Sequence, residues 1–251
     1  MAVVEINGLK IGQGVPKICV PLVGKTDREL VEQAIHANQC GCDLVELRID
    51  YYERVNTIEK VVDCIHKIKE CLSVPILFTF RTFEEGGNQP LSKEYYGKLY
   101  DAVIENGSVE VIDLELSLGE MVLRPLIKKA RQKGIKVLLS SHDFLKTPVT
   151  NEIIARLRRM QELGADIVKI AVMPKSKEDV LRLMDATLYM NNNHSQTPVV
   201  GISMGDMGIP SRFLGDWFGS AITFGVASKV SAPGQLSVQR LQQLFKLLTN
   251  E

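Results

Sequence analysis

The sequence has no excess of charge of either sign, since 30 Lys and Arg residues offset 30 Asp and Glu residues. Binding to nucleic acid or to an anionic membrane normally needs a basic excess, so we expect neither partner. No run approaches the ~18 apolar residues of a membrane helix. The first ten residues, MAVVEINGLK, lack the apolar core of a signal peptide. We therefore expect a soluble, cytoplasmic protein.

Cysteine is scarce, and its number is odd. The five are Cys19, Cys40, Cys42, Cys64 and Cys71. Such a set does not indicate the disulfide framework of a secreted protein. Because no C-x-x-C pair accompanies a histidine cluster, the sequence predicts no zinc site. We expect Cys40 and Cys42 to be reduced, packed thiols.

What the chain does contain is a repeated pattern of short apolar strand followed by helix. The expected strands are 17–23, 44–49, 75–80, 109–116, 135–140, 167–171, 198–202 and 221–226. The expected helices are 27–39, 57–71, 92–105, 121–133, 150–163, 177–190, 213–218 and 237–248. This alternation predicts a parallel sheet with helices packed on it.

Eight such units in 251 residues favour an α/β fold of one domain, 1–251, closed as a (β/α)8 TIM barrel. The alternative is an open, doubly wound sheet. It is weakened because no strand is followed by a G-x-G-x-x-G or G-x-x-x-x-G-K-[ST] loop. Before the first unit, Val3 to Ile11 alternates around Asn7-Gly8, which predicts a β-hairpin that closes one end of the barrel.

Lys169 is the anomaly in the sequence A-D-I-V-K-I-A-V-M, Ala165 to Met173. The surrounding Ile and Val residues predict a buried strand, and burial disfavours a charged ammonium. One interpretation is structural: the lysine extends to solvent or pairs with a carboxylate. The other is catalytic, because a lysine that is neutral near pH 7 attacks carbonyl carbons and forms Schiff bases.

Further polar residues fall where strands end, the edge at which barrel enzymes carry their active sites. They are Glu46, Arg48, Asp50, Arg81, Glu84, Glu85, Asp113, Glu115, Ser140 to Asp143, Ser203, Arg212 and Ser231 to Gln235. Each has a structural alternative, such as a Glu46–Arg48 ion pair. So many buried charges must pair with one another or surround an anion. Arginine favours carboxylates and phosphates. Because no glycine-rich phosphate loop is evident, the sequence favours a ligand with a carboxylate and hydroxyls.

Five motifs in this order resemble type I 3-dehydroquinate dehydratase along essentially the whole barrel. They are R-T-F-E-E-G-G at Arg81, D-L-E-L at Asp113, S-S-H-D at Ser140, V-K-I-A at Val168 and S-A-P-G-Q at Ser231. One departure is Ser141, where the family more usually has a larger residue before the histidine.

The resemblance implies dehydration of 3-dehydroquinate to 3-dehydroshikimate, in the shikimate pathway of aromatic amino-acid biosynthesis, without metal or cofactor. It implies that Lys169 forms an imine, His142 is the general acid and base, and Glu85 orients His142. For substrate binding it implies Arg212 at the carboxylate, a lid with Ser231 and Gln235, and ring hydroxyls held by Glu46, Arg48 and Arg81. It also implies a homodimer.

Two other functions stay open on the sequence. A class I aldolase uses the same Schiff-base lysine, but would normally need a phosphate site. A non-catalytic barrel could bind a small carboxylic acid, but would gain nothing from a desolvated lysine nucleophile.

Overall fold

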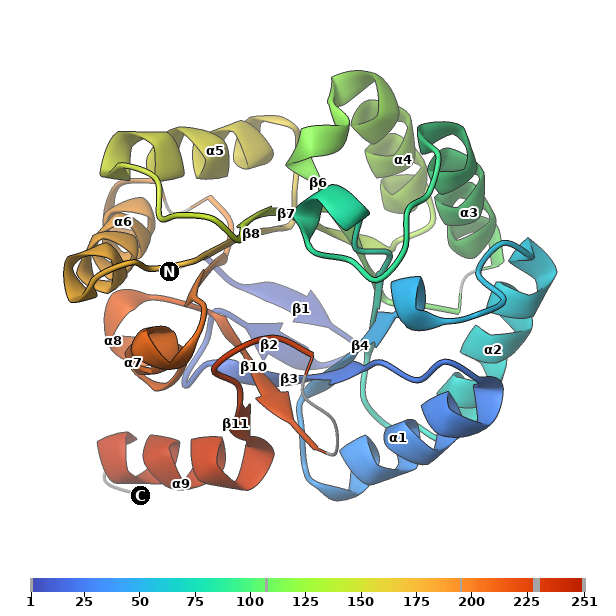
Figure 1. The fold of residues 1–251 in the computed structure, drawn as a ribbon, viewed down its shortest axis with the longest axis horizontal. Coiled ribbons are helices and arrows are strands. Elements are labelled where there is room, and N and C mark those ends of the chain that lie inside the picture. Colours follow the sequence, from blue (N-terminus) through green and yellow to red (C-terminus); the bar gives the residue numbers. More distant parts are fainter. Residues whose placement is uncertain (1, 107, 195, 228–230, 250–251) are drawn as a thin grey trace.

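The core of the molecule is a ring of eight parallel strands with helices around it (Figure 1). The computed structural model describes residues 2–106, 108–194, 196–227 and 231–249. The ring consists of β3 (Lys17–Leu22), β4 (Leu44–Arg48), β5 (Ile76–Thr79), β6 (Val111–Glu115), β7 (Lys136–Asp143), β8 (Ile167–Val172), β9 (Val199–Ser203) and β10 (Ile222–Val226).

The ring closes between β9 and β10. There the Ala221 amide donates to the Val199 carbonyl at 2.8 Å, and Val199 forms a parallel bridge with Ser220. β10, the last strand of the ring, pairs in parallel with β3, the first. The other neighbouring pairs follow chain order, as right-handed strand–helix–strand units require. The predicted TIM barrel is confirmed, and the open sheet is excluded.

The helices form the outer layer, with apolar stripes that pack on the strands. They are α1 (Asp27–Gln39), α2 (Ile58–Glu70), α3 (Lys93–Asn106), α4 (Glu120–Gln132), α5 (Thr150–Glu162), α6 (Lys177–Asn193), α7 (Ile209–Phe213), α8 (Gly215–Phe218) and α9 (Val238–Thr249). Thr26 caps α1, since its hydroxyl accepts from the Glu29 amide. No helix in the described part of the chain is both long and apolar enough to span a membrane.

The predicted N-terminal hairpin is present as antiparallel β1 (Val4–Ile6) and β2 (Leu9–Ile11). Asn7 and Gly8 both have positive φ, 48° and 84°, as a tight two-residue turn requires. Ile6 and Ile11 are buried in the cluster that fills the inside of the barrel. The hairpin crosses the centre of the ring in Figure 1, so it closes one end as expected.

Two details differ from the sequence prediction. The single helix expected over 213–218 is wrong: the chain forms α7 and α8, and Gly215 approaches Ser220 too closely for a longer side chain. β7 continues three residues beyond the expected end at Ser140, because it pairs with β8 as far as Asp143 and Val172. His142 therefore lies on a strand, not in the loop after it.

Candidate active site

One pocket opens where the strands of the barrel end. It holds about 590 Å³ not occupied by protein, part of it open to solvent. All nine side chains predicted from the sequence line it: Glu46, Arg48, Arg81, Glu85, His142, Lys169, Arg212, Ser231 and Gln235. The fold thus brings together polar residues from distant parts of the chain.

Lys169 on β8 is buried at the base of this pocket. Its Nζ lies 3.8 Å from both Glu46 Oε1 and Asp113 Oδ2, and 4.1 Å from the centre of the Phe224 ring. Burial lowers the pKa of Lys169 below its usual value, and the two carboxylates offset this only in part. The amine is therefore flanked by carboxylates, but at distances longer than a hydrogen bond.

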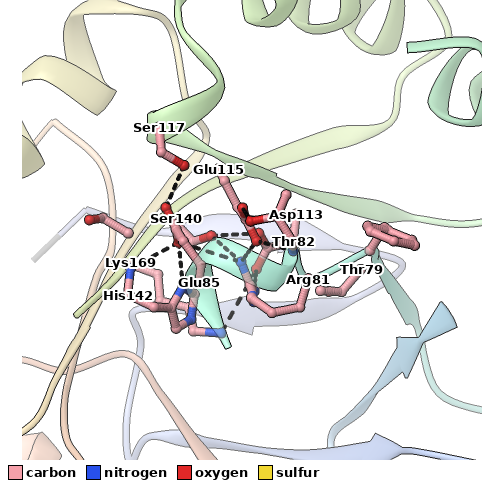
Figure 2. Close-up of polar contacts among 12 residues, drawn as sticks. Thr79, Arg81, Thr82, Glu85, Asp113, Glu115, Ser117, Ser140, His142 and Lys169 are labelled. Atoms are coloured by element: carbon pink, nitrogen blue, oxygen red, sulfur yellow. Dashed lines mark hydrogen bonds and ion pairs between the residues drawn. The ribbon is translucent and has the colours of Figure 1, made fainter. Parts of the chain in front are cut away.

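His142 and Glu85 form a buried pair (Figure 2). Glu85 Oε2 lies 2.8 Å from His142 Nδ1 and accepts the His142 backbone N–H at 2.9 Å. Burial, reinforced by Glu115, raises the pKa of Glu85 to about 7. Burial and the cations Arg81, Lys169 and Arg48 lower the pKa of His142. The imidazole is therefore neutral near pH 7, the form that accepts a proton.

Arg81 is held inside the protein by two carboxylates. Its Nη2 donates to Asp113 and its Nη1 to Glu115, both at 2.7 Å, and Nη1 also donates to Ser140 at 3.0 Å. These contacts appear in Figure 2. Arg81 lines the pocket, but both of its terminal nitrogens already have acceptors in the protein.

Arg48 is neutralised locally by Asp50, which accepts from Nε at 2.8 Å and from Nη2 at 2.9 Å. β4 ends at Arg48, so Asp50 lies in the 3-10 turn η1 (Ile49–Tyr51). The structural alternative of a Glu46–Arg48 ion pair is not found among the ion pairs of the described residues, where Glu46 instead accepts from Thr79 at 3.1 Å and faces Lys169.

Arg212 differs from Arg48 and Arg81 in having no carboxylate partner among the described residues. It is 2% exposed, and its Nη2 donates to the Pro233 carbonyl at 2.8 Å. Its Nε has no hydrogen-bond partner in the described structure, and no carboxylate of the described residues pairs with it. Burial lowers its pKa to about 10. A buried guanidinium with an unused donor at a pocket is suited to an external carboxylate.

Ser231 and Gln235 lie on the segment that follows β10. Gln235 Oε1 accepts the Ser231 amide at 2.9 Å, and Gln235 Nε2 donates to the Ser231 hydroxyl at 2.9 Å. The Pro233 carbonyl also accepts from the Gly205 amide at 3.2 Å. This segment therefore contacts both Arg212 and the loop after β9, and it borders the pocket mouth.

Comparison with known proteins shows which family the chain belongs to. The family model for type I 3-dehydroquinase matches residues 18–251. A 3-dehydroquinate dehydratase of Clostridium novyi is 45% identical, over 100% of this chain and 99% of its own length. The chain belongs to the type I 3-dehydroquinase family. It is thus an enzyme, of the lyase class.

Solved structures of type I 3-dehydroquinases superimpose closely on the barrel. A crystal structure from Clostridium difficile with covalently modified comenic acid has a TM-score of 0.96 and 42% identity, covering 99% of this chain and 98% of that one. One from Enterococcus faecalis has a TM-score of 0.92 and 42% identity, covering 97% and 98%.

The sequence did not predict the apolar part of the pocket lining, which includes Phe224 and Phe144. Phe224 could have been found, because alternation along β10 puts it on the same face as Ile222, inside the barrel. Phe144 lies in the loop after β7 and carries no periodic signal. No group of His, Cys, Asp and Glu side chains within the described ranges has the arrangement of a metal site.

Proposed function

We propose that this enzyme dehydrates 3-dehydroquinate to 3-dehydroshikimate through a Schiff base on Lys169. The observation that carries the proposal is the combination, in one pocket, of a buried amine with lowered pKa and a buried arginine without an anion. The first suits a ketone carbon and the second suits a carboxylate. 3-Dehydroquinate carries both groups on one ring. We infer the identity of the substrate from the names of the relatives, which are 3-dehydroquinate dehydratases.

In the first step Lys169 attacks the ring ketone, and water leaves as the imine forms. The protonated imine withdraws electrons from the neighbouring C–H bond, so that no metal is needed to acidify it. His142, through the ring nitrogen that Glu85 does not engage, takes this proton. It then returns a proton to the departing hydroxyl, which leaves as water. Water hydrolyses the imine and frees Lys169.

The remaining pocket residues bind and orient the substrate. Arg212 takes the carboxylate, and Gln235 and Ser231 close the pocket mouth over it. Glu46 and Arg48 face the ring hydroxyls. Arg81, whose terminal nitrogens are engaged by Asp113 and Glu115, contributes mainly positive charge near the iminium and His142. Glu85 fixes the orientation of the imidazole.

We further propose, on the family resemblance alone, that the chain forms a homodimer and works in the cytoplasm. Sedimentation equilibrium over a range of concentrations tests the first statement. A mass equal to one chain at all concentrations contradicts it.

Trapping with borohydride tests the mechanism. Reduction in the presence of 3-dehydroquinate should give one adduct per chain by intact mass, and peptide mapping should place it on Lys169. Lys169→Met should give neither adduct nor turnover, because a thioether does not form an imine. His142→Ala should still give adduct while turnover collapses.

The controls separate the alternatives. Phosphorylated aldol substrates should give no adduct, and an adduct with them would favour an aldolase. Binding of 3-dehydroquinate without adduct or turnover in the wild type would favour the non-catalytic barrel. An adduct on another lysine, or full activity in Lys169→Met, would contradict the proposed mechanism.

A further inference from the structure

The Glu85 carboxylate has a second partner outside the pair with His142. Glu85 Oε2 is occupied by the backbone N–H and the Nδ1 of His142. Oε1 lies 2.6 Å from the hydroxyl of Ser117 (Figure 2). Ser117 belongs to the 3-10 turn η3 (Leu116–Leu118), which directly follows β6. A continuous chain of hydrogen bonds therefore runs from Ser117 through Glu85 to the imidazole.

The surroundings of Glu85 make the hydrogen bond from the Ser117 hydroxyl important for the charge state of Glu85. Glu85 is 5% exposed. Around it lie Arg81 just after β5, with Nη1 4.0 Å from Oε2, Asp113 and Glu115 on β6, and His142 on β7. Lys169 on β8 lines the same pocket. The nearest cation is itself paired with the two other carboxylates. Ionised Glu85 therefore has little compensating positive charge, and the hydrogen bond from Ser117 favours that ionised form.

We propose that Ser117 is a positioning residue for the reaction: its hydroxyl holds Glu85 as a carboxylate that keeps the proton of His142 on Nδ1. This rests on the proposed function, in which His142 uses its other ring nitrogen. A carboxylate that accepts from Ser117 at Oε1 leaves Oε2 to accept from Nδ1–H. A protonated Glu85 instead presents a donor to Nδ1 or to Ser117, and the tautomer of His142 is no longer fixed.

Ser117 is well placed for a test because its hydroxyl can be removed without disturbing the core. It is an exposed residue, whereas its neighbour Leu118 is buried and anchors η3. Ser108 supplies a matched control. It lies before β6, at the opposite end of this strand, and its hydroxyl donates to the Asn106 carbonyl. Both serines thus make one hydrogen bond, but only that of Ser117 reaches Glu85.

The experiment measures kcat/KM for 3-dehydroquinate against pH for the wild type, Ser117→Ala, Ser117→Thr and Ser108→Ala. The acidic limb of this profile reports groups of the free enzyme that must lose a proton. We expect Ser117→Ala to move the limb upward by about 0.5 to 1 pH unit, the size of one hydrogen bond to a charged group with partial replacement by water. Ser117→Thr should restore it, and Ser108→Ala should match the wild type.

A second readout does not need turnover. The ¹³C signal of the Glu85 carboxyl, assigned by its loss in Glu85→Gln, should titrate at higher pH in Ser117→Ala than in the wild type. An unchanged limb and an unchanged carboxyl titration in Ser117→Ala overturn the inference. Absence of dehydratase activity in the wild type overturns the proposed function instead, and the carboxyl titration then still decides whether Ser117 acts on Glu85.

Discussion

Lys169 Nζ and Asp113 Oδ2 lie 3.8 Å apart, close enough for charge attraction and too far for a hydrogen bond. Asp113 is fully buried and gives its shorter contact, 2.7 Å, to Arg81. The carboxylate therefore anchors Arg81 and at the same time raises the pKa of Lys169 against the effect of burial. Lys169 therefore has a carboxylate nearby whose shorter contact is with Arg81.

We expect Asp113→Asn to lower the pKa of Lys169 further and to destabilise the protein by about 3 kcal/mol, because Arg81 loses a buried partner. The pH dependence of amidination at Lys169 and chemical denaturation measure the two effects. Asp101→Asn is the control: Asp101 also pairs with a cation, Lys129, but its side chain is 54% exposed. It should change stability by no more than about 1 kcal/mol. An unchanged Lys169 pKa in Asp113→Asn would contradict the electrostatic role.

Arg212→Lys keeps the charge but loses the planar fork, so we expect substrate affinity to fall by about 1–3 kcal/mol. Burial of Arg212 without an anion is the reason to expect an external carboxylate there. Isothermal titration with a non-reactive carboxylic acid analogue gives the affinity directly. If Arg212→Lys has no effect while Arg81→Lys abolishes binding, Arg81 and not Arg212 is the carboxylate residue.

Gln235→Ala should raise KM with a smaller effect on kcat, because the side chain stabilises the segment at the pocket mouth and makes no contact with the reacting groups in the described structure. Steady-state kinetics at the pH optimum separates the two constants. A large loss of kcat at unchanged KM would assign Gln235 to the chemical step.

Comparing Gly86→Ala with Gly119→Ala distinguishes the effect of backbone strain on stability from the effect of pocket shape on KM. Both glycines have positive φ, 84° and 83°, so alanine should destabilise the protein by about 1–3 kcal/mol at either position. A Cβ at Gly86 would also lie 2.4 Å from the Phe144 ring, whereas at Gly119 it meets nothing within 4 Å. Because Phe144 lines the pocket, only Gly86→Ala should raise KM. Equal kinetics in both variants would mean that Phe144 does not shape the site.

Stability should depend on pH through Glu85. Folding raises the pKa of Glu85 from 4.5 to about 7. The contribution of protonated Glu85 to the free energy of unfolding is therefore complete below about pH 4, and it is lost as the pH rises through 7. The loss is about 3 kcal/mol. Glu85→Gln removes this pH dependence. The free energy of unfolding of the variant, measured by urea denaturation, should therefore rise relative to that of the wild type between pH 5 and pH 8.

Glu94→Gln is the control for the direction of the change in stability with pH. The hydrogen bond from Lys98 lowers the pKa of Glu94, so any change there lies at lower pH and has the opposite sign. A constant difference in stability between Glu85→Gln and the wild type across pH 5 to 8 would contradict the raised pKa.

The hydrophobic pattern of the sequence predicted most of the barrel, because the periodicity of a strand or helix is visible in consecutive residues. The expected helix 27–39 agrees with α1 at both ends, and Thr26 is its cap. Prediction was wrong where distant contacts decide. α7 ends before Leu214 and α8 begins at Gly215, where Pro16 and Ser220 leave no room for a side chain. Neither of these contacts lies within residues 213–218.

The sequence by itself determined that Lys169 would lie within an apolar strand, and that charged residues would gather at one edge, since parallel strands end together. Only the tertiary structure decided that Lys169 is buried and which residues pair with which. Asp113 and Glu115 pair with Arg81, Asp50 pairs with Arg48, and Arg212 has no carboxylate partner among the described residues. These choices depend on distances of a few ångströms between different strands and loops. Such distances follow from strand register and barrel closure, and no spacing along the chain encodes them.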